Sequence, residues 1–135
     1  MPFPVEWKYI AETQRKLKTR FPLDYVVRMK RENGGAFSVE GEAWFLFPIF
    51  DTSNDKRIKR TCSDVCHETK EMFSFDVGFP TNAIAIANNG CGDVLFFLPD
   101  EEEPERLQDN VFCFRLRGGE IVDFESTFRE LTENE

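Results

Sequence analysis

The stretch FPTNAIAIANNGCGDVLFFL, from Phe79 to Leu98, predicts two apolar strands joined by a tight turn. Residues 83–87 and 94–98 are apolar runs of strand length. The connection NNGCGD, residues 88–93, is rich in Asn, Gly and Asp, which accept a positive φ or bond to their own backbone. A β-hairpin is therefore expected over this stretch.

Helical patterns come before this hairpin. A first amphipathic helix is expected over residues 5–19, with Trp7 on its apolar stripe. Pro22 suits the first turn of a second helix, and Asn33 with Gly34 supplies the stop of that helix. On the second helix the pattern predicts an inner face of Leu23, Val26, Val27 and Lys30, with Tyr25 at its edge.

Strand candidates follow at residues 37–39 and 43–50, separated by a turn at Gly41. Pro48 limits the second strand to an edge position or an early end, because proline lacks the N–H that a ladder needs. The WFLF run within it is apolar on both faces. We therefore expect helices to cover one face and a loop or a partner chain to cover the other.

The middle of the chain predicts one amphipathic helix that follows capping candidates at residues 52–54 and reaches Phe73. Apolar residues recur there at intervals of three and four positions, which is the spacing of a single helix face. Cys62 and Cys66 fall on this face, so both thiols are expected to be buried.

The last third of the chain contains two more strand candidates, VFCFRL at residues 111–116 and IVDF at residues 121–124. A glycine turn at residues 117–120 separates them. Thr127 and Glu130 have the spacing of a capping box, which predicts a short final helix.

Length and charge limit the possible roles of the chain. Its 135 residues are the size of one domain, expected to span residues 1–135. The formal net charge of −8 argues against nucleic acid or an anionic membrane as partner. It either attracts a basic protein or only keeps the protein soluble. No apolar run approaches the roughly 18 residues that cross a bilayer, and the start lacks a signal-like pattern. A cytoplasmic protein with reduced thiols is therefore expected.

Short motifs follow one another along the chain: FPLDYVVRMKRENGG at residues 21–35, AWFLFP at 43–48, the Phe-Pro pair at 79–80, the alanine-rich strand and glycine turn at 83–93, and STFREL at 126–131. In this order they resemble the SUKH superfamily of Smi/Knr-like proteins over nearly the whole chain. The residues of this resemblance expected to hold the scaffold are Asn33, Gly34, Gly35, Trp44, Pro80, Asn89, Gly90, Gly92 and Asp93.

The resemblance implies an α+β fold in which helices pack on a mixed, largely antiparallel sheet. Many bacterial members of the superfamily are immunity proteins that bind polymorphic toxins, often nucleases, without catalysis. A non-catalytic immunity protein with no cofactor is therefore implied. Some fungal relatives resemble adaptors in cell-wall signalling, so a regulatory scaffold stays open as an alternative. Apolar residues at 44–50 equally allow a homodimer.

His67 is the only histidine, and Cys62 and Cys66 lie near it in the sequence, so a zinc site has to be considered. On one continuous helix His67 lies roughly 180° from the face that carries Cys62 and Cys66. The spacing also matches none of the usual paired zinc patterns. No metal site is therefore expected.

Cys91 in the glycine turn is a candidate nucleophile if His67 approaches it and Asp93 or Asn89 orients the imidazole. The turn also has a structural explanation, in which its glycines permit the backbone path and Cys91 packs as a small apolar residue. A thiol enzyme using Cys91 is thus a second alternative, and no catalytic residue is assigned.

A dense acidic loop lies between two of the strand candidates. Such a loop suits a basic partner, because opposite charge raises the association rate most at low salt. The alternative is a solvated loop with no partner. The candidate partner-binding residues are Asp100, Glu101, Glu102, Glu103 and Glu105.

Overall fold

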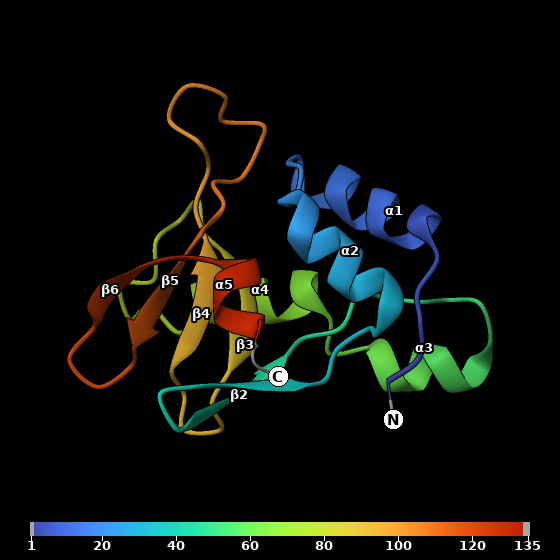
Figure 1. The fold of residues 1–135 in the computed structure, drawn as a ribbon, viewed down its shortest axis with the longest axis horizontal. Helices are drawn as coiled ribbons and strands as arrows, with labels where there is room; N and C mark the ends of the chain where they lie inside the picture. The colour runs from blue at the N-terminus through green and yellow to red at the C-terminus, as the bar shows by residue number, and fades with distance from the viewer. Residues whose placement is uncertain (1, 134–135) are drawn as a thin grey trace.

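The computed structural model describes residues 2–133, in which helices pack on one antiparallel sheet (Figure 1). The helices are α1 (Trp7–Leu17), α2 (Leu23–Arg31), α3 (Asp55–Thr61), α4 (Val65–Ser74) and α5 (Phe128–Thr132). The strands are β1 (Ala36–Val39), β2 (Glu42–Leu46), β3 (Ile84–Asn88), β4 (Val94–Phe97), β5 (Asn110–Arg115) and β6 (Glu120–Thr127). The predicted α+β fold is confirmed.

The six strands of the described chain pair in sequence order, β1-β2-β3-β4-β5-β6, and each neighbouring pair is antiparallel. The predicted hairpin forms β3 and β4, so residues 79–98 supply the middle of the sheet. A parallel contact is made outside the named strands, as an isolated bridge between Arg20 and Arg106.

Opposite faces of the sheet are covered by different helices. Phe97 packs edge-on against Tyr25 of α2, with ring centroids 5.5 Å apart, and it also meets Phe128 of α5. The neighbouring Phe96 faces the other way, because successive strand residues alternate, and its ring centroid lies 5.2 Å from that of Phe79. Helix α4 covers this second face, and Figure 1 shows α5 and α4 on opposite sides of the strands.

The expected inner face of α2 is confirmed for Val26, which is buried, and is otherwise wrong, because Lys30 is exposed and the remaining two positions are exposed as well. Tyr25 is fully buried, whereas Leu23 is 75% exposed and Val27 is also exposed. The Tyr25 ring contacts aromatic rings from α5 and β4, which lie far away in the sequence. In this position a tyrosine ring buries more apolar area than a leucine side chain would. On α1, Trp7 is likewise exposed, and the buried residues are Tyr9, Ile10 and Thr13.

The single helix expected after residue 54 is two helices. Asn54 caps α3 as predicted, since its side chain accepts a hydrogen bond from Arg57 N. The chain then breaks after Thr61, and Asp64 begins α4 by accepting a hydrogen bond from His67 N at 3.0 Å. Asp64 is a strong N-cap residue, and this local signal outweighs the continuous apolar spacing.

The two faces of the WFLF run are covered unequally by the described chain. Trp44 and Leu46 are buried, but Phe45, which points to the opposite face, is 49% exposed. Strand β2 ends at Leu46, two residues before Pro48, so the predicted early end is confirmed. Within residues 2–133, the helices are all too short or too polar to cross a membrane.

Candidate functional site

The acidic loop, residues 100–105, projects from the sheet between β4 and β5 and is orange at the top of Figure 1. Hydrogen bonds attach the C-terminal end of the loop, at Glu105, to the segment between α1 and α2. Arg20 N donates to the Glu105 carbonyl at 2.9 Å, and Thr19 Oγ1 donates to the same carbonyl at 3.2 Å. The loop therefore has a defined conformation next to the helices.

Two carboxylates of the loop stabilise the loop itself. Asp100 Oδ1 accepts hydrogen bonds from the amides of Glu102 and Glu103, and Asp100 Oδ2 lies 3.3 Å from Arg106 Nη2. These amide bonds are the main reason that the pKa of Asp100 lies below its usual value, and Arg106 adds to the effect. Glu103 lies 3.5 Å from Arg106 and 3.9 Å from Arg20.

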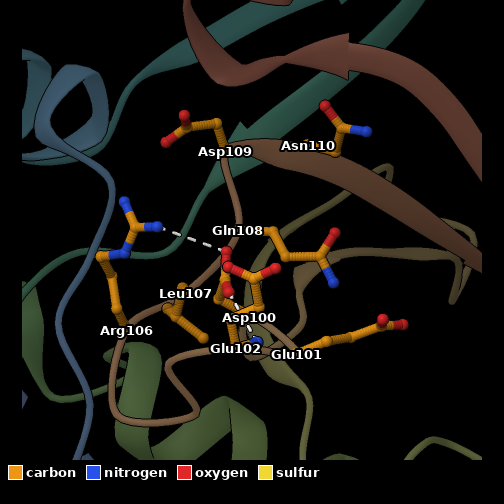
Figure 2. A pocket seen from close by; sticks show the side chains of 8 residues that line it. All are labelled: Asp100, Glu101, Glu102, Arg106, Leu107, Gln108, Asp109 and Asn110. Atoms are coloured by element: carbon orange, nitrogen blue, oxygen red, sulfur yellow. Dashed lines mark hydrogen bonds and ion pairs between the residues drawn. The ribbon is translucent and has the colours of Figure 1, made fainter.

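The other three loop carboxylates, Glu101, Glu102 and Glu105, are exposed and form no ion pair with a described residue. Glu101 and Glu102 border an open hollow of about 510 Å³. Figure 2 shows Arg106 directed toward Asp100 across this hollow, while the Glu101 carboxylate points away. The loop thus presents three negative charges that no neighbouring cation of the described chain neutralises.

A polar cluster joins three hairpins at the opposite end of the sheet. Arg115 Nη1 lies 3.0 Å from Asp93 Oδ2 and 3.2 Å from Glu42 Oε1. Asp93 Oδ1 also accepts a hydrogen bond from Leu116 N, and the Asn89 amide donates to both carboxylates. Burial opposes ionisation of Asp93, but these hydrogen bonds outweigh it and lower the pKa of that carboxyl.

Trp44 lies beneath this cluster. Its ring is fully buried, and the Arg115 guanidinium lies 5.8 Å from the ring centroid, within the range of a cation–π contact. The indole N–H has no hydrogen-bond partner among the described residues. The Trp44 ring therefore forms an apolar contact surface beneath the Glu42–Asp93–Arg115 cluster.

Asn33 links the end of α2 to the chain after β2. Its side-chain amide donates to the Ile49 carbonyl at 2.9 Å, and its carbonyl accepts from Ile49 N at 2.7 Å. The buried Arg28 donates to the carbonyls of Glu32 and Gly34, which closes the turn from the other side. Gly34 and Gly35 follow at positive φ. Pro80 is placed in a separate turn, where its carbonyl accepts from Ala83 N.

The turn between β3 and β4 is organised by its own side chains. Asn89 Oδ1 accepts hydrogen bonds from Cys91 N and Asp93 N, while Asn88 Oδ1 accepts from Gly90 N. Gly92 has φ +96°, and a Cβ on it would lie 2.6 Å from a methyl carbon of Leu116. This glycine therefore meets both a backbone and a steric requirement.

The structure does not assemble the thiol site that the sequence allowed. Cys91 is exposed, and it does not line the cavity that His67 shares with Gly90 and Gly92. Asn89 is hydrogen-bonded within the turn, and Asp93 accepts a hydrogen bond from Arg115. His67 Nε2 instead lies 3.7 Å from Glu71.

The prediction of two buried thiols in the middle helix is wrong in part. Cys62 is exposed at the break between α3 and α4, whereas Cys66 is half-buried. Burial is the main cause that raises the pKa of Cys66 to about 11, with Asp64 adding to it. Over residues 2–133, no cluster of three His, Cys, Asp or Glu residues suits a metal ion.

Sequence reasoning did not identify Glu42 or Arg115 as cluster members. Both belong to ordinary strand ends, and they are 73 positions apart. Nothing in the local pattern marks Arg115 as a residue that pairs with distant carboxylates. The strand register, which brings three hairpin ends together, is what places them in contact.

Comparisons with known proteins complete the description of these features. The model of the SMI1 / KNR4 family (SUKH-1) matches residues 4–134, nearly the whole chain. No curated protein and no solved structure matches the chain. The match covers the turn cluster, the Asn33 turn and the acidic loop alike.

Proposed function

This chain belongs to the SMI1 / KNR4 family (SUKH-1), and from that premise we propose that it is a non-catalytic protein-binding domain of the immunity type. Its partner is a basic toxin domain, for which a nuclease is the best candidate. The acidic loop is the contact surface. Residues 1–135 act as one domain, in the cytoplasm of the cell that needs protection.

The observation that supports the proposal is that some carboxylates of the acidic loop form ion pairs and the others do not. Asp100 and Glu103 are held by Arg106 and Arg20, so their charge maintains the loop. Glu101, Glu102 and Glu105 remain exposed without an ion pair within the described chain. A basic surface that meets the loop gains three opposite charges without first breaking an internal pair.

The charge of the whole protein supports the same partner chemistry. A formal net charge of −8 repels nucleic acid and attracts the basic surface with which a nuclease binds its substrate. An immunity protein that covers that surface would exclude the substrate sterically and electrostatically. No catalytic group is needed for this action.

The experiment is affinity capture from native cells with the tagged protein at low and moderate salt, followed by binding kinetics with the purified partner. The test variant is Glu101→Gln/Glu102→Gln/Glu105→Gln. The control, Glu6→Gln/Glu40→Gln/Glu133→Gln, removes the same charge from exposed carboxylates elsewhere. We expect one dominant basic partner, and an association rate about 10-fold lower for the loop variant at low salt.

The outcomes separate the possible roles. Equal rates for the two triple variants would remove the loop from the interface. Several unrelated housekeeping partners, without protection against any captured toxin, would favour the regulatory scaffold. A captured toxin whose activity persists in the saturated complex would contradict the immunity role.

A further inference from the structure

A second concave surface lies at the other end of the molecule, between α4 and the ends of the central strands. Its volume is about 500 Å³, and it shares no lining residue with the hollow at the acidic loop. We call it the α4 groove. Its apolar lining is Phe47, Met72, Phe75, Val94 and Leu116.

Exposed apolar side chains gather around the α4 groove. Phe75 is 57% exposed and Leu116 is 40% exposed, and both line it. The strand register extends this surface across the sheet: Phe45 pairs with Asn88, which lines the groove, and Ile121 lies at the far end of the same row. Single exposed hydrophobics are ordinary, but a group around one cavity is typical of a binding surface.

The wall of the groove is acidic. Glu68 and Glu71 lie three positions apart on α4, and therefore on neighbouring parts of its surface. Burial is the main reason that the pKa of Glu68 is raised; Glu71 and Asp64 add to the effect and His67 opposes it. His67 is the only basic side chain among the described residues that line the groove, and its imidazole faces Glu71.

We infer that the α4 groove receives a segment of a partner protein in which a lysine or arginine stands next to an apolar side chain. The cation meets Glu68 and Glu71, and the apolar side chain covers Phe75 and Leu116. This inference rests on the proposed role as a protein-binding domain and gives that domain a second contact surface. A second copy of this chain is disfavoured as the occupant, because two chains of net charge −8 repel each other.

The groove suits a short segment rather than a whole domain surface. Its volume falls within the usual range for ligand pockets, roughly 300–1,000 Å³, which admits a few side chains at a time. An apolar floor with two carboxylates on one wall also matches the amphipathic character of lysine and arginine, whose methylene stems pack while their charged ends are paired.

The test uses blocked tetrapeptides as probes in NMR titrations of the full chain. The basic probe is acetyl-Phe-Lys-Leu-Arg-amide, and its matched controls replace both cations by Gln or by Glu. We expect the basic probe to produce saturable shifts of the Gly90 and Gly92 amides and of the Met72 and Leu116 methyl groups. The Glu peptide should bind at least about 10-fold more weakly.

Two charge-matched variants identify the groove as the source of this preference. Glu68→Gln/Glu71→Gln should lower the affinity for the basic probe about 10-fold and leave the Gln peptide unaffected. Glu101→Gln/Glu102→Gln, which makes the same charge change at the acidic loop, should leave both affinities unchanged. Dispersed amide spectra would verify that each variant is folded.

Equal binding of the three peptides in the groove would overturn the inference and indicate a general apolar site. Shifts confined to residues 100–105, or no shifts at millimolar peptide, would also overturn it. These results are distinct from a failure of the proposed function. A toxin whose binding depends on the loop carboxylates but not on Glu68 and Glu71 would support the loop and contradict the groove.

Discussion

Arg115 Nη1 donates a 3.0 Å hydrogen bond to Asp93 Oδ2, and this pair joins the turn before β4 to the end of β5. The same nitrogen donates to Glu42 at the start of β2, so one arginine connects three hairpins. Asp93 is mostly buried, and its remaining oxygen accepts from Leu116 N. The pair therefore stabilises the sheet at the end where these three hairpins meet.

Asp93→Asn should destabilise the protein by about 2 kcal/mol at pH 7, because it removes the charged partner of Arg115. The folded pKa of Asp93 lies below the unfolded value of about 3.9, so its contribution is present above about pH 4 and disappears as the pH falls through the folded pKa. Urea unfolding at pH 7, 5 and 3 should show the two proteins converging at low pH. A constant difference at all three values would contradict this assignment, and Asp109→Asn, at an exposed carboxylate, is the control.

Asn33→Ala should cost about 2–3 kcal/mol in the free energy of unfolding, because it leaves both backbone groups of Ile49 without their side-chain partner in a buried position. Asn33→Asp keeps the acceptor for Ile49 N but places a carboxylate oxygen against the Ile49 carbonyl, so it should also destabilise. Chemical denaturation measures both effects. Asn82→Ala, at an exposed position, should change the stability by less than about 0.5 kcal/mol; an equal effect at residues 33 and 82 would refute the prediction.

Gly90→Ala and Gly92→Ala form a matched pair within one turn. Both glycines have positive φ, so each substitution should cost about 1 kcal/mol from backbone strain. Only at Gly92 would the new Cβ meet Leu116, whereas nothing lies within 4 Å at Gly90. Thermal unfolding should therefore rank Gly92→Ala as the less stable variant, and the Leu116 methyl signals should shift in it alone. Leu116→Ala should reduce the difference between the two.

The four thiols should react at two clearly separated rates with a disulfide reagent at pH 8. Cys62 and Cys91 are exposed and should react quickly. Burial raises the pKa of Cys66 and of Cys113 to about 11, which leaves about one thiolate in a thousand at that pH. Colorimetric titration should count two fast thiols in the folded protein and four after unfolding. Loss of the fast phase in Cys62→Ser/Cys91→Ser would confirm the assignment, and four equal rates would contradict it.

Local patterns predicted the elements of this fold well and their orientation less well. The hairpin of residues 79–98 and the capping box at Thr127 depend on neighbouring residues, and the structure contains both. Helix α2 ends at Arg31, two residues before the predicted stop at Asn33. The buried face of α2 was predicted only in part, because Leu23 and Tyr25 both fit an amphipathic helix. Which of the two is buried depends on the Phe97 and Phe128 rings, which belong to β4 and α5 and pack against Tyr25.

The same division applies to the candidate sites. The acidic loop is visible as a run of like charges, but the sequence does not show which carboxylates are paired; Arg20 reaches Glu103 only through the chain path between α1 and α2. The α4 groove has no sequence signal, because its walls come from α4, the residue after β2, the β3–β4 hairpin and the residue after β5.

The sequence by itself determined the order of helices and strands apart from the break between α3 and α4, together with the turn chemistry and the acidic character, since each depends on local backbone preferences or on composition. Tertiary structure alone decided that Glu42, Asp93 and Arg115 form one cluster and that Cys91 and His67 do not form one site. The physical reason is register. Pairing strands residue by residue fixes which distant side chains share a face and an end of the sheet, and no local preference encodes that choice.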